Sequence, residues 1–96
     1  MSEIVSLQQR FAVQIARLIL AAEARGIGLR FGDCYRDPRV TYGHPNSLHR
    51  QRLAVDLIAE DEAHHVELHD LWDTMGGAPR IEGDYNHYSF ERSGMT

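Results

Sequence analysis

The sequence predicts an α+β fold, in which a small antiparallel sheet packs against two to three helices. Two stretches, 4–22 and 62–75, repeat their apolar residues at the three-to-four spacing of a helix face. Three shorter stretches, 29–35, 53–59 and 81–91, carry strand-like patterns. The resulting order is helix, strand, loop, strand, helix, strand, which indicates an α+β layout.

The first predicted helix follows from a long apolar stripe near the N-terminus. Ser2 is a suitable N-cap residue, and Gly26 and Gly28 supply a stop signal. Such a stripe could bind a partner or a membrane surface, but it ordinarily packs on the core of its own domain, and we interpret it so. Its members are Ile4, Leu7, Phe11, Ile15, Leu18 and Ala22.

The first predicted strand, 29–35, runs into the turn residues Arg36-Asp37-Pro38. A proline pushes the residue before it out of helical geometry, so the strand is expected to end at Asp37. The segment 40–47 is rich in residues that break regular structure. Loops of this kind contact substrates or serve as plain connectors.

The stretch 53–59 fits two structures. As a strand, it places Asp56 on the face opposite an apolar row. As a helix, it allows His49 and Asp56, seven residues apart, to share a face. A straight strand would turn His49 away from Asp56, so the strand interpretation requires a bend between them.

The second predicted helix, 62–75, is preceded by acidic residues, which the helix dipole favours at an N-terminus. Gly76-Gly77 ends it. After it, the stretch 81–91 alternates as a strand does. The apolar rows of the helix are Val66, Leu68, Leu71, Trp72 and Met75.

Composition limits the class of protein. A formal net charge of −4 argues against a general nucleic-acid binder, since phosphate contacts need clustered positive charge. Cys34 is the single cysteine, so no internal disulfide can form. No apolar run approaches the ~18 residues of a membrane span, and a secretory signal is not expected. We therefore expect residues 1–96 to form one monomeric domain without nucleic-acid or membrane partners.

His49, Asp56 and His87 are the candidate metal ligands. Two imidazoles and one carboxylate suit zinc, with a fourth position left for water. Asp56 interrupts an otherwise apolar strand, where an unmatched charge would be costly. With six histidines and fourteen acids in the chain, three unrelated polar residues are the alternative. Non-haem iron uses the same donors, but usually with a shorter His-x-Asp spacing.

Ser-x-His-x6-Asp at 47–56 and Asp-x-x-His at 84–87 resemble the zinc D-Ala-D-Ala carboxypeptidase and L-alanyl-D-glutamate endopeptidase family. These enzymes, several phage endolysins among them, cut the stem peptides of bacterial cell walls. The resemblance spans roughly Asp33 to Phe90. It implies a Hedgehog/D-Ala-D-Ala peptidase-like fold, with His49 in a loop before the strand and the chain bent between His49 and Asp56.

The resemblance also implies roles for other residues. Asp84 is the candidate general base that takes a proton from the attacking water, with Glu82 in reserve. Arg36, in a Tyr-Arg segment, is the candidate stabiliser of the oxyanion. Ser47 is a candidate substrate contact. The ordinary alternatives are a turn aspartate, a surface arginine in an ion pair and a serine that only shapes its loop.

One position departs from the family pattern Ser-x-His-x-x-Gly-x-Ala-x-Asp. Arg52 stands where the family has glycine, which permits tight backbone packing. The form His-x-x-Arg-Leu-Ala resembles a phage-type branch. An arginine at this position requires an open face, so the departure bears on the shape of the substrate pocket.

A rival metal pair is found in the second helix, where His65 and His69 are four residues apart and share a face. The segment lacks the His-Glu-x-x-His order of helical zinc proteases. We interpret these histidines as part of a solvated face beside Asp61 and Asp73.

Together these observations predict a zinc-dependent peptidase that hydrolyses L-Ala-D-Glu in the peptidoglycan stem peptide. A phage enzyme of this kind is expected to remain in the cytoplasm until it is released to the wall. A D-Ala-D-Ala carboxypeptidase or dipeptidase is the nearest alternative. A non-catalytic phage structural or wall-binding domain, with a purely structural metal, is the alternative from another class.

Overall fold

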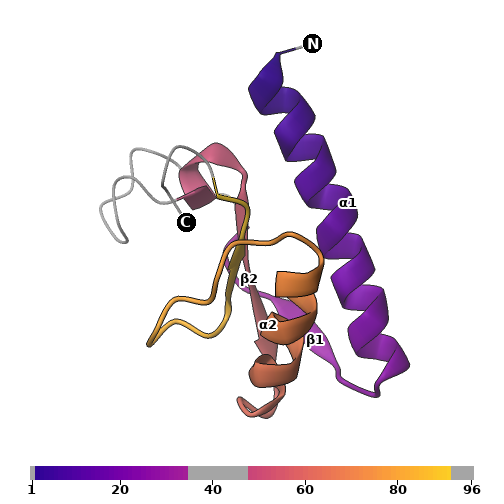
Figure 1. The fold of residues 1–96 in the computed structure, drawn as a ribbon. Helices are drawn as coiled ribbons and strands as arrows, with labels where there is room; N and C mark the ends of the chain where they lie inside the picture. Colours follow the sequence, from indigo (N-terminus) through magenta and orange to yellow (C-terminus); the bar gives the residue numbers. More distant parts are fainter. Residues whose placement is uncertain (1, 35–47, 92–96) are drawn as a thin grey trace.

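The structure is a computed structural model that describes residues 2–34 and 48–91. The described residues form two helices, one short 3-10 helix and one antiparallel sheet with the strand order β1-β2-β3 (Figure 1). This arrangement confirms the predicted α+β class. The elements are α1 (Glu3–Ala24), β1 (Leu29–Phe31), η1 (Leu48–Gln51), β2 (Ala54–Ala59), α2 (His64–Thr74) and β3 (His87–Ser89).

Helix α1 begins and ends as predicted. The Ser2 hydroxyl accepts a hydrogen bond from the Val5 N–H at 3.3 Å. The helix ends before Gly26, whose φ of 73° is a left-handed conformation that glycine adopts without steric cost. The predicted stripe faces inward: Phe11, Ile15, Leu18 and Ala22 are buried, and Ile4 and Leu7 pack against the core.

The central strand β2 has two chemically different faces. Val55 pairs with Tyr88 of β3, and Asp56 pairs with His87. Directly paired residues of antiparallel strands point to the same face. Val55 and Tyr88 therefore share one face, and Asp56 and His87 share the other.

The core lies on the Val55 face, between the sheet and both helices. It contains α1 residues, Val55 and Leu57 of β2, Leu68 and Trp72 of α2, and Tyr88 of β3. The strand interpretation of the stretch 53–59 is thereby confirmed, and the helix interpretation is wrong. As predicted, Asp56 lies opposite the core-facing row.

Helix α2 ends as predicted, but its inward face differs from the predicted one. Gly76 has a φ of 85°, and a Cβ on Gly77 would overlap the Trp72 indole. Val66, predicted in an apolar row, is 55% exposed. The buried positions of the helix are His65, Leu68, His69 and Trp72.

The outer strands are shorter than predicted. Within 81–91, only His87–Ser89 forms a strand, because the preceding residues make a turn in which Ile81 bridges Asp84 and Gly83 has a φ of 82°. Strand β1 covers three of the residues predicted in 29–35. The turn expected at Asp37 and the loop 40–47 lie outside the described residues. No described helix is long and apolar enough to cross a membrane.

Candidate metal centre

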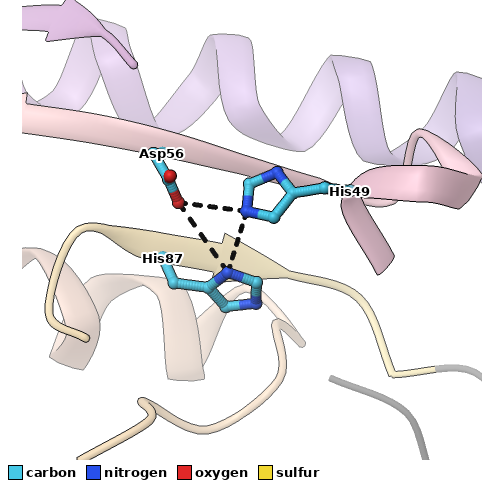
Figure 2. A group of neighbouring side chains, drawn as sticks. All are labelled: His49, Asp56 and His87. Carbon is cyan, nitrogen blue, oxygen red and sulfur yellow. Dashed lines mark hydrogen bonds and ion pairs between the residues drawn. The ribbon is translucent and has the colours of Figure 1, made fainter. Parts of the chain in front are cut away.

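The structure brings His49, Asp56 and His87 together (Figure 2). The carboxylate Oδ1 of Asp56 lies 3.1 Å from His49 Nε2 and 3.8 Å from His87 Nδ1. The two imidazole nitrogens, His49 Nε2 and His87 Nδ1, are 3.2 Å apart. Figure 2 shows the three side chains pointing toward a common point, with helix ribbons behind the strands.

Local structure explains how distant parts of the chain meet here. Asp56 and His87 are directly paired across β2 and β3. His49 lies in η1, and the chain turns between it and β2 through Arg52, whose φ is 57°. The bend that the strand interpretation required is therefore present, and it lies at the position where the resembled family has glycine.

The spacing of the three atoms fits one small cation. Four ligands placed tetrahedrally at zinc-like distances of about 2.0–2.1 Å would lie about 3.3–3.4 Å from one another. The separations of 3.1, 3.2 and 3.8 Å lie around that value. His49 and His87 are only 2% and 4% exposed, whereas the Asp56 side chain is 24% exposed. The group could hold a metal ion. The buried imidazoles would shield the ion from solvent on one side, and solvent could reach it beside the Asp56 carboxylate.

The segment after β1 fixes the backbone of Asp56. The Gly32 N–H donates to the Asp56 carbonyl at 2.8 Å, and the Asp56 N–H donates to the Asp33 carbonyl at 2.7 Å. A Cβ on Gly32 would lie 3.0 Å from the Asp56 Cβ, a very tight contact. Neither of these two hydrogen bonds was predicted from the sequence. Gly32 lies inside the predicted strand 29–35, where a glycine is the one signal of a close backbone approach.

The other predicted site residues that the structure describes do not belong to the His49-Asp56-His87 group. Asp84 and Glu82 are exposed on the turn before β3. The Asp84 carbonyl accepts a hydrogen bond from the His87 N–H at 3.3 Å, so Asp84 is part of the turn that leads into a candidate ligand. Arg36 and Ser47 lie outside the described residues.

The interpretation of His65 and His69 as a solvated face is wrong. Each is about 1% exposed, on the core side of the sheet. The Ala59 N–H donates to His65 Nε2 at 3.3 Å, and His69 Nε2 lies 2.8 Å from the Tyr85 carbonyl. These backbone partners replace water, which is why two polar side chains occupy core positions.

Burial changes how these histidines titrate. It lowers the pKa of His65, and the neighbouring His69 lowers it further. Burial also lowers the pKa of His69, against the opposing effect of its hydrogen bond to the Tyr85 carbonyl. A charged imidazole at either position would lose hydration that the core does not replace.

Acid is therefore expected to destabilise the fold. The unfolded chain takes up protons on these histidines below about pH 6.5, while the folded chain resists. Stability is fully present above that pH and falls as the pH decreases toward the lowered folded pKa values. Each histidine contributes a slope of at most about 1.4 kcal/mol per pH unit. Urea unfolding of the metal-free protein across this range measures the effect.

Two variants separate this effect from other titrations. His69→Phe keeps an aromatic ring but removes one titrating group, so the slope becomes shallower. His64→Gln removes an exposed neighbour that is the smallest of the causes acting on the His65 pKa, and it is expected to change the slope less than His69→Phe does. Equal slopes in His69→Phe and the wild type would contradict the expectation.

Arg52 is the only described residue other than glycine with a positive φ. A left-handed conformation costs a residue with a Cβ about 1–2 kcal/mol. Arg52→Gly is therefore expected to be more stable than Arg52→Ala by about 1 kcal/mol, as measured by urea unfolding. The alanine variant is the control, because it removes the guanidinium and keeps the Cβ. Equal stabilities would show that this turn is not strained.

No protein-family model, curated protein or solved structure matches the chain. The description of the protein therefore depends on its fold and its candidate site alone. It is a small α+β chain with a largely buried His-Asp-His group that could hold a metal ion.

Proposed function

We propose that the protein is a zinc-dependent peptidase that hydrolyses a stem-peptide bond of peptidoglycan, namely L-Ala-D-Glu, on a D-Ala-D-Ala peptidase-like fold. The observation that carries the proposal is the convergence of His49 Nε2, Asp56 Oδ1 and His87 Nδ1. Their order and spacing in the sequence are those of the family that the chain resembles.

The donor set supports zinc and a catalytic use of it. Catalytic zinc sites commonly have three protein ligands from histidine and carboxylate and keep a fourth position for water. Zinc held there would supply Lewis acidity, which makes water acidic enough to attack an amide near neutral pH. The partly exposed side of Asp56 is where water and substrate would approach.

Asp84 is the proposed general base. Its carboxylate is exposed, and its turn leads directly into His87. It accepts the proton of the attacking water and returns it to the leaving amine nitrogen as the peptide bond breaks. Arg36 is proposed to stabilise the negative charge on the peptide carbonyl oxygen, and Ser47 to contact the substrate.

Product analysis tests the proposal. Zinc-loaded protein is incubated with peptidoglycan of known stem peptide, alongside chelated protein and chelated protein restored with zinc. The expected product is a newly free amino group on D-glutamate, present only in the two zinc-containing samples. Release of D-alanine would instead identify a D-Ala-D-Ala carboxypeptidase.

The near-complete burial of His49 and His87 favours one second candidate, a non-catalytic wall-binding domain with a structural metal. Structural zinc sites are usually closed by four protein ligands. Wall binding without any released product, together with one tightly held zinc, would favour this candidate over the peptidase.

A further inference from the structure

Two buried histidines lie on the opposite face of β3 from the candidate metal centre. We infer that His65 and His69 of α2 are positioning residues, which hold the segment from Tyr85 to Tyr88 so that His87 faces the metal. The inference rests on the proposed function in one respect, namely that His87 binds a metal ion. The contacts that carry it involve none of the three candidate ligands.

His69 contacts both ends of this segment. Its ring stacks on Tyr88, with ring centroids 4.2 Å apart and an interplanar angle of 9°. Its Nε2 lies 2.8 Å from the Tyr85 carbonyl, which can only accept, so Nε2 carries the proton and donates. One side chain therefore holds the backbone before His87 and the side chain after it.

His65 connects the same segment to β2. Its Nε2 accepts the Ala59 N–H, so the neutral ring carries its proton on Nδ1. That proton is donated to the Tyr88 hydroxyl, whose oxygen lies 2.6 Å away. The two histidines thus use opposite tautomers, each fixed by a backbone partner.

These contacts determine where His87 points. Successive side chains of a strand point to opposite faces, so holding Tyr88 on the α2 side turns His87 to the other side. Strand β3 is only three residues long, so its pairing with β2 covers three residue pairs and the contacts of its side chains add to what fixes its register. Residues around a metal site orient its ligands, and here they do so through the strand backbone.

The positioning contacts work only with neutral rings. A proton on His65 Nε2 would displace the Ala59 N–H. A proton on His69 Nδ1 would meet no acceptor, since that buried atom has no hydrogen-bond partner within the described ranges. The lowered pKa values of both histidines agree with this requirement.

The first test needs no metal. His69→Phe keeps the stacked ring but loses the hydrogen bond to Tyr85, and Tyr88→Phe removes only the hydroxyl. Ile15→Val, in the α1 part of the same core, is the control. At urea concentrations that equalise global stability, amide exchange of Leu57 and His87 is expected to be up to roughly tenfold faster in the first two variants than in the control. These amides donate to Asn86 and Asp84.

The second test uses cobalt(II), whose absorption spectrum reports ligand geometry. At saturating cobalt, His69→Phe and Tyr88→Phe are expected to show altered spectra and roughly 10- to 100-fold weaker affinity, while Ile15→Val matches the wild type. Exchange and spectra equal to those of Ile15→Val would overturn the positioning role and leave ordinary core packing. A wild type that binds no cobalt would instead remove the proposed function, while amide exchange would still decide the positioning role.

Discussion

Replacing Asp84 by asparagine is expected to reduce stem-peptide hydrolysis by roughly 10²- to 10⁴-fold, the usual contribution of a positioned general base. Asparagine has nearly the same shape but cannot accept the proton of the attacking water. Zinc affinity and stability are expected to remain as in the wild type, because the Asp84 side chain is exposed and outside the ligand group. Hydrolysis rates and zinc titration on the same samples measure both quantities.

Glu82→Gln is the matched control, because Glu82 is also an exposed acid on the turn before β3. It is expected to retain full activity. A reversed result, with activity lost in Glu82→Gln and kept in Asp84→Asn, would assign the base to Glu82. Loss of zinc in Asp84→Asn would contradict the separation of base and ligands.

Zinc is expected to raise the thermal unfolding midpoint by roughly 15–30 °C when its free concentration is about 1,000 times the dissociation constant. A ligand that binds only the folded state contributes about 4 kcal/mol at that concentration, and a domain of this size gains about 4–8 °C per kcal/mol. The three ligands meet only after β2 pairs with β3, so the unfolded chain offers no equivalent site. Thermal unfolding with zinc and with chelator measures the shift.

Asp56→Asn is expected to abolish this shift and to weaken zinc binding by more than about 100-fold, because an amide oxygen is a poorer ligand than a carboxylate. Glu60→Gln, a change to an exposed acid just after β2, is the control and is expected to keep the full shift. A full shift in Asp56→Asn would place the bound zinc elsewhere.

Local features of the sequence predicted much of the fold and brought the candidate ligands to attention. Helix α1 was predictable because Ser2, the apolar stripe and Gly26 act within a few residues of one another. Asp56 was noticeable because it interrupts an apolar strand, and the family pattern connected it to His49 and His87.

Features that depend on distant contacts were not predictable. His65 and His69 were assigned to solvent because imidazole is polar, and their backbone partners belong to other elements. Gly32, a glycine inside a predicted strand, indicates a close backbone approach, but it does not indicate that the approaching residue is Asp56. The extent of β3 was overestimated because alternation continues through a turn that Gly83 makes possible.

The alternation along β2 ties the folding of the chain to its chemistry. Val55 and Leu57 stabilise the core, while Asp56 between them faces His49 and His87, the two other candidate metal ligands. Deleting one residue at the start of this strand would exchange the two sets, burying the carboxylate and presenting leucine to the imidazoles. We therefore expect homologues of this protein to carry no insertions or deletions within this strand, even at positions where they tolerate point substitutions.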